Sequence, residues 1–194
     1  LYHVERMNEE SANALLKVME EPPEGVLFLL TADSLASVLP TIRSRCVSFA
    51  VAPVSPADCT RYCAAQGVDK KTAALYSELF DGHIGTVLAV ARDEARAAQV
   101  EKALELARTA AARDIYTAAV LLAAYEKDKA AAAALLTDFR AVAAAGLRSS
   151  PRAPVQGTQA RQAVRLADAA LQRLGAQVNP KVVLTVFAAK LRTL

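Results

Sequence analysis

Alanine is concentrated in the second half of this 194-residue chain, and this feature limits the possible folds most strongly. It occurs in uninterrupted runs at 130–134 and 143–145. Alanine is the best helix former, and its small side chain lets neighbouring helices approach closely. Aromatic residues make up only 5% of a chain that is 54% hydrophobic. We therefore predict a folded, mainly helical protein with one large domain or two to three small ones.

The charge of the chain is close to balanced. The net charge is +3, from 23 basic and 20 acidic residues that are spread along the sequence. A dedicated nucleic-acid binder would be expected to gather its Lys and Arg residues in one cluster. Charge alone therefore favours no particular partner.

The three cysteines are Cys46, Cys59 and Cys63, and they lack the paired spacing of a structural zinc site. Cys59 and Cys63 share one helical face and could form half of a metal site, but we favour two small residues packed in a core. The sequence has no signal peptide and no long apolar run of about 18 residues. We therefore expect a cytoplasmic protein with reduced thiols.

The opening residues, Leu1 to Met7, lack an initiator methionine and a preceding turn, so we expect a fragment of a longer protein. Asn8 then precedes a predicted helix. The apolar run 26–31 predicts a strand covered on both faces in a parallel sheet, and 46–50 predicts a second strand. The loop 33–37 begins at the carboxyl end of the first strand, where α/β sheets place ligands. Residues 1–52 are thus predicted to form the second half of an α/β nucleotide-binding sheet.

Three linked blocks in this segment carry a family resemblance. They are Asn13-Ala14-Leu15-Leu16-Lys17-Val18-Met19-Glu20-Glu21-Pro22-Pro23, Phe28-Leu29-Leu30-Thr31 and Thr41-Ile42-Arg43-Ser44-Arg45-Cys46. In their order and spacing these blocks resemble bacterial clamp-loader subunits of the AAA+ class, which belong to DNA polymerase III. The resemblance implies a C-terminal remnant of an AAA+ α/β domain at 1–52.

The resemblance also implies a role for Arg45. In that family the Ser-Arg-Cys motif, here Ser44, Arg45 and Cys46, carries an arginine finger that one subunit points at the γ-phosphate of ATP bound by its neighbour. A guanidinium supplies permanently charged, planar donors, which suits the charge that spreads over a transferring phosphoryl group. The alternative is an ion-paired arginine that caps a helix. Arg43 is expected to be a solvated neighbour.

Two departures from the family pattern bear on hydrolysis. In the family, a threonine called the sensor lies near the γ-phosphate of ATP. Its position in this chain is occupied by Ala32, with Thr31 one place earlier, so the sensor is displaced or absent. The lid arginine of hydrolysing relatives falls at Gly85, and His83 in the same turn is expected to be a helix-cap residue rather than a phosphate contact. This combination resembles the non-hydrolysing delta-prime group more than the gamma/tau motor subunits.

The rest of the chain is predicted to be helical. Residues 53–93 would form a three-helix lid, with helices from Ser55-Pro56, from Asp69 and from His83. Residues 94–194 would form a helical collar that packs against other subunits, because the ending Val178-Asn179-Pro180-Lys181 also resembles the family. Its helices are expected at 92–112, 114–125, 127–146, 158–174 and from 179 onward, with a loop at 148–157.

The sequence contains no glycine-rich phosphate loop, no acidic pair for magnesium and no nucleophile–histidine arrangement. We therefore expect no intrinsic catalysis, no metal and no cofactor in these residues, with ATP bound by a neighbouring subunit. The expected partners are the gamma/tau and delta subunits and, through the complex, the sliding clamp and primed DNA, with no membrane. Two alternatives stay open: an ATP-hydrolysing gamma/tau motor subunit, and a freestanding helical DNA-binding module.

Overall fold

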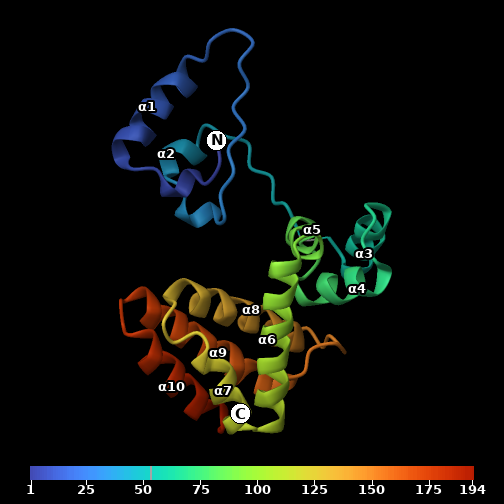
Figure 1. Ribbon diagram of the computed structural model, residues 1–194. Coiled ribbons are helices and arrows are strands. Elements are labelled where there is room, and N and C mark those ends of the chain that lie inside the picture. The colour runs from blue at the N-terminus through green and yellow to red at the C-terminus, as the bar shows by residue number, and fades with distance from the viewer. Residues whose placement is uncertain (53) are drawn as a thin grey trace. The chain divides into compact units, whose positions relative to one another are not determined.

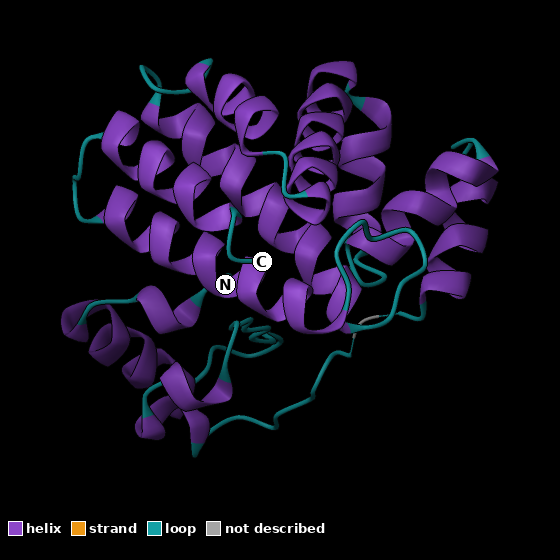
Figure 2. Cartoon of the chain, turned by 90° about the horizontal axis from the view of Figure 1, so that it is seen from below, coloured by secondary structure: helices purple, strands orange, loops and turns teal. Residues whose placement is uncertain are grey.

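The computed structural model describes residues 1–52 and 54–194, and these divide into two compact units. The first unit is Leu1–Ala52 and the second is Pro53–Leu194. Pro53, at which the lid was predicted to begin, lies outside the described residues. Figure 1 labels the helices of both units, and Figure 2 shows helices and loops without strands over the described residues. The prediction of a mainly helical protein is confirmed.

The first unit is built from short helices joined by long extended segments (Figure 1). Its small core gathers Ala12 and Leu15 from one helix with Val4, Val38 and Ile42 from the segments on either side. The helical elements are η1 Val4–Arg6, α1 Glu9–Glu20, η2 Leu35–Ser37 and α2 Pro40–Arg43. Asn8 caps α1, since its side chain accepts a hydrogen bond from Ser11 N at 2.8 Å, as the sequence predicted.

The two predicted strands are wrong for the structure as described. Residues 26–31 and 46–50 are extended, but neither forms a ladder. A strand needs neighbouring strands to accept its backbone hydrogen bonds, and the described chain supplies only a short pairing of 1–4 with 29–31. The expected burial on both faces is also absent, because Leu27 is 81% and Phe49 84% exposed. The predicted α/β sheet is therefore absent from the residues that the structure describes.

The second unit contains eight helices in its described residues. The first three correspond to the predicted lid helices, and the remaining five to the predicted collar helices. The elements are α3 Pro56–Ala65, α4 Lys70–Leu79, α5 Ile84–Arg92, α6 Glu94–Ala112, α7 Ile115–Ala123, α8 Lys129–Leu147, α9 Gly157–Gly175 and α10 Pro180–Leu191.

Side-chain caps fix where these helices begin. Ser55, Asp69, Asp114 and Asn179 each accept a hydrogen bond from a backbone N–H in the first turn of the following helix. Such bonds satisfy donors that have no partner within the helix. The sequence predicted one helix across 92–112, whereas Asp93 ends α5 and caps α6 through Arg96 N at 3.1 Å.

The core of the second unit rests on small residues along α6, α8 and α9. Phe139 of α8 and Phe187 of α10 meet edge to face with ring centroids 5.4 Å apart, which is a favourable aromatic geometry. Many of the other fully buried side chains of this unit are alanine, including Ala103, Ala107, Ala132, Ala143, Ala163 and Ala167. These buried alanines let the helices pack closely, as the sequence predicted.

Helix α8 is long and apolar enough to cross a membrane if length and composition are the only criteria. Half of its most apolar window is buried within the protein, and the core helix of a soluble protein meets the same criteria. The connection from α8 to α9 contributes to the same core, since Ala153 and Val155 are buried.

Candidate functional site

Arg45 lies in the turn that follows α2. Pro40 occupies the first position of this helix, where its missing N–H costs nothing, and Ile42 anchors the helix by its burial in the core of the first unit. The chain then turns, with Arg45 N donating to Ile42 O at 3.1 Å. The backbone therefore holds Arg45 at the surface, immediately beside a buried residue.

The guanidinium of Arg45 has partners on its own unit. Nη1 donates to Thr41 O at 3.1 Å and to Ser44 Oγ at 3.4 Å, and Nη2 forms an ion pair with Glu20 at the end of α1. The Arg45 side chain is still 39% exposed. This is the geometry of the helix-capping, ion-paired arginine, and it leaves part of the guanidinium open to solvent. The finger role stays a prediction.

The motif neighbours of Arg45 have local roles. Ser44 is exposed, and its Oγ donates to Thr41 O at 3.0 Å. Cys46 is a free thiol, half-buried against the core of the first unit. Both residues shape the turn that carries Arg45. Arg43 is exposed on α2.

Gly85, at the position of the family's lid arginine, is in the first turn of α5. A Cβ at Gly85 would meet no atom within 4 Å, so packing does not require glycine there. His83 caps the same helix without a side-chain bond to it, and its Nδ1 lies 2.7 Å from Phe80 O. Gly82 differs from Gly85, because a Cβ at Gly82 would lie 1.7 Å from Val54 O.

The cysteine pair Cys59 and Cys63 is buried in the core of the second unit, with the two sulfur atoms 4.0 Å apart. Burial, and then the neighbouring Cys59, raises the pKa of the Cys63 thiol to about 11. Neither thiol joins a group of three potential metal ligands among the described residues. The arrangement agrees with a packing role.

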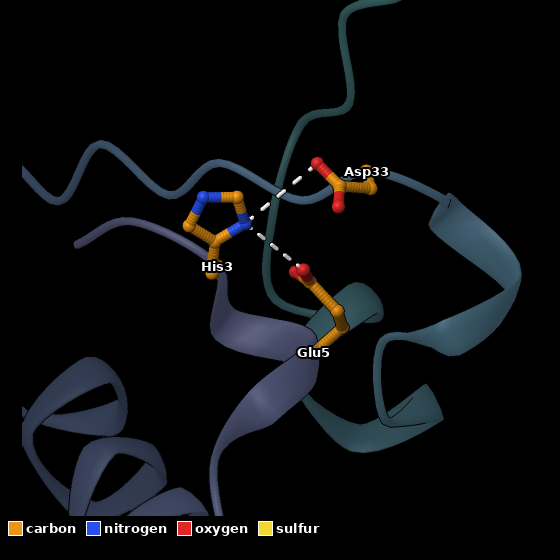
Figure 3. A group of neighbouring side chains, drawn as sticks. All are labelled: His3, Glu5 and Asp33. Atoms are coloured by element: carbon orange, nitrogen blue, oxygen red, sulfur yellow. Dashed lines mark hydrogen bonds and ion pairs between the residues drawn. The ribbon is translucent and has the colours of Figure 1, made fainter. Parts of the chain in front are cut away.

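The first unit also contains a cluster of three polar side chains that the sequence did not predict. His3, Glu5 and Asp33 converge in the first unit, as Figure 3 shows. His3 Nδ1 lies 3.2 Å from Glu5 Oε1 and 3.6 Å from Asp33 Oδ1. The pKa of Glu5 lies below its ordinary value, chiefly because its own backbone N–H is close and also because of His3 and Arg6. The only sequence signal was the position of Asp33 just after an apolar run, since no motif joins residues so far apart.

Thr31, adjacent to the family's sensor position, forms hydrogen bonds with the segment that carries His3 and Glu5. Its N–H donates to Leu1 O at 2.9 Å, its carbonyl accepts from Val4 N at 3.1 Å, and its Oγ1 accepts from His3 N at 3.4 Å. The hydroxyl of Thr31 therefore faces the backbone of His3.

Comparison with known proteins gives matches to part of the chain. Residues 1–55 match the family described as DNA polymerase III, delta subunit. A DNA polymerase III subunit delta-prime from Yersinia pestis is 45% identical over 62 residues, which are 32% of this chain and 18% of that protein. The delta-prime subunit from Haemophilus influenzae is 62% identical over 42 residues, which are 22% of this chain and 13% of that protein.

The chain is delta-prime-like over this part of its length. A DNA polymerase III subunit gamma from Buchnera aphidicola is also similar, at 40% identity over 55 residues, which are 28% of this chain and 15% of that protein. The delta-prime-like chain thus spans less than one fifth of the length of these relatives in each match. Residues 56–194 lie outside the family match.

Proposed function

We propose that this delta-prime-like chain is part of a non-hydrolysing subunit of the replicative clamp loader. It would help to place the sliding clamp on primed DNA in the cytoplasm, and Arg45 would complete the ATP site of a neighbouring subunit. The observation that carries this proposal is the position of Arg45. It lies inside the segment that matches DNA polymerase III subunits, on an exposed turn with a guanidinium that is partly free.

The partners of Arg45 would not prevent it from acting on a neighbour. Its ion pair with Glu20 is exposed on both sides, and exposed pairs contribute only about 0.2–1 kcal/mol. A phosphate with several negative charges would compete well for the same guanidinium, because arginine binds phosphate oxygens through parallel N–H donors. The Glu20 pair would then hold Arg45 in place until the neighbouring nucleotide arrives.

Gly85 favours the non-hydrolysing type over the gamma/tau type. The structure has room for a side chain at this position, so its glycine is not a packing requirement. Loss of the lid arginine would remove one phosphate contact from the subunit's own site while Arg45 remains available to a neighbour. The match to a gamma subunit keeps the hydrolysing type as the second candidate.

Helices α7 and α10 supply a surface for partner subunits. They contact each other and line a shallow apolar groove that includes Ile115, Leu122 and Leu184. Tyr116, Val120, Val182 and Val186 on these two helices are exposed. Exposed apolar side chains beside an apolar groove would suit packing against gamma/tau and delta subunits.

The test is reconstitution of clamp loading. The full protein would be combined with gamma/tau and delta subunits, sliding clamp, primed DNA and ATP from the same organism, and clamp loading would be measured with and without it. We expect loading to depend on the protein. Equal loading in its absence would overturn the proposal.

Two measurements on the protein alone separate the alternatives. ATP hydrolysis by the isolated full protein would favour the gamma/tau type, whereas the proposed type shows none. DNA binding that weakens steeply with added salt would favour the DNA-binding module, because such binding releases counterions from the phosphates.

A further inference from the structure

The cluster of His3, Glu5 and Asp33 lies outside the machinery proposed above. Two chain segments bring it together: residues 1–6 contribute His3 and Glu5, and the loop before η2 contributes Asp33. Hydrogen bonds from Val4 N to Thr31 O and from Thr31 N to Leu1 O hold the segments side by side. These bonds place the three side chains close together (Figure 3).

Glu5 provides a second, independent observation on this cluster. Its side chain is only 10% exposed and is directed toward His3 and Asp33. Its Oε2 is buried and has no hydrogen-bond partner. A buried carboxylate oxygen without a hydrogen-bond donor is costly, so a donor or a cation beside this oxygen would stabilise the carboxylate.

Arg6 is the nearest cation in the cluster and does not meet this need. Its Nε lies 3.8 Å from Glu5 Oε1 and its Nη2 lies 3.9 Å from Asp33 Oδ2, both beyond hydrogen-bond distance. The Arg6 side chain is also largely exposed. Arg6 thus lowers the repulsion between the carboxylates without satisfying them.

The distances fit a small tetrahedral metal ion. Zinc binds imidazole nitrogen and carboxylate oxygen at about 2.0–2.2 Å, so neighbouring ligand atoms in a tetrahedral site lie roughly 3.3–3.5 Å apart. His3 Nδ1 is 3.2 Å from Glu5 Oε1 and 3.6 Å from Asp33 Oδ1, and the ligand atoms of all three residues lie within 4.8 Å of one another.

We propose that His3 Nδ1 and the carboxylates of Glu5 and Asp33 bind a divalent transition-metal ion, with Zn²⁺ as the best match and water as the fourth ligand. One imidazole and two carboxylates suit zinc better than magnesium or calcium, which take oxygen ligands alone. His3 would bind the ion as a neutral imidazole, with its proton on Nε2. The ion would fasten residues 3–5 to the loop at Asp33.

The test is calorimetric titration of the full chain with ZnCl₂ at neutral pH, in a buffer that does not bind zinc and with the thiols kept reduced. We expect one ion per chain. His3→Gln and Asp33→Asn should each weaken binding by at least about 10-fold, since each replaces a strong ligand by a neutral amide and even outer partners of metal ligands contribute that much. Both side chains are at least half exposed, so these variants are expected to fold, and circular dichroism checks this.

The matched control is His83→Gln, which removes the other of the two histidines in the chain and should bind zinc as the unmodified protein does. Equal affinities for His3→Gln and His83→Gln would overturn the proposal. Titration with Co²⁺ gives a second readout, because thiolate ligands produce a charge-transfer absorption in the near ultraviolet. Such a band would place the metal at cysteine and would also overturn it. Zinc binding by the isolated chain is independent of clamp loading, so either proposal can fail alone.

Discussion

The guanidinium of Arg45 is paired with the carboxylate of Glu20, 25 positions earlier in the sequence. The pair joins the end of α1 to the turn after α2, and both side chains are partly exposed. Arg45 is therefore positioned by its own unit while its outer edge remains accessible. A guanidinium held in this way could still contact a nucleotide bound by a neighbouring subunit, as proposed.

Glu20→Gln tests how much the ion pair with Arg45 contributes to stability. Because the pair is exposed and screened by solvent, we expect the free energy of unfolding to fall by no more than about 1 kcal/mol. Urea denaturation of the full chain measures this change. A loss of several kcal/mol would show that Arg45 is a structural residue and is not easily released.

Arg96→Ala tests the buried ion pair between α6 and α8. Arg96 makes a two-pronged contact with Asp138, whose side chain is only 3% exposed. Removing Arg96 leaves a buried carboxylate without a partner, so we expect a loss of about 3 kcal/mol in the free energy of unfolding. The control is Arg140→Ala, whose pair with Asp168 is half exposed and should contribute less than about 1 kcal/mol. Equal losses in urea denaturation would contradict this assignment.

Gly146→Ala tests the close contact between α8 and the connection to α9. A Cβ at Gly146 would lie 1.9 Å from Val155 O, so the backbone must move, and we expect a loss of about 1–3 kcal/mol. Gly175→Ala is the matched control, because a Cβ there meets no atom within 4 Å. It should leave the thermal midpoint unchanged or raise it. A midpoint for Gly146→Ala at or above that of the control would count against this packing.

The thiols should differ in reactivity. Cys46 is half-buried at the edge of the first unit, whereas Cys63 is fully buried with its pKa raised to about 11. At pH 8 we expect a disulfide reagent to modify Cys46 first and Cys63 only after denaturant is added, because the thiolate is the reacting form. Equal rates for all three thiols in the native protein would be inconsistent with this core.

The raised pKa of Cys63 also affects the stability of the protein at high pH. The thiol of Cys63 has an ordinary pKa of 9.0, and the folded state raises it to about 11. Below pH 9 the thiol is protonated in both states, so its contribution to stability is complete. As the pH rises from 9 to 11, the unfolded chain releases this proton first, and the free energy of unfolding falls.

The sequence predicted the helices well because their signals are local. The caps at Asp69, Asp114 and Asn179 lie within three residues of the N–H groups that they satisfy. The strands at 26–31 and 46–50 were predicted wrongly, because a continuous apolar run indicates burial but does not supply the neighbouring strands. Strand formation depends on distant segments of chain, and local patterns do not contain them.

For Arg45 and for the cluster of His3, Glu5 and Asp33, too, the sequence indicated local features but not contacts between distant residues. Arg45 was identified through three blocks of sequence, yet its pairing with Glu20 joins residues that no helical spacing connects. The cluster of His3 and Asp33 was missed for the same reason. The hydrogen bond from His3 N to Thr31 Oγ1 helps to bring the two segments together, and it joins residues 28 positions apart. Such contacts become visible only once the backbone path is known.

The most direct test of the proposed function is the ATPase activity of the reconstituted clamp loader with Arg45→Ala in the full protein, measured with sliding clamp and primed DNA. An arginine finger contributes about 10³-fold or more at the site that it serves, so turnover at the neighbouring site should be lost. Arg43→Ala, an exposed arginine two residues away, is the control and should retain activity. Undiminished turnover with Arg45→Ala would contradict the account.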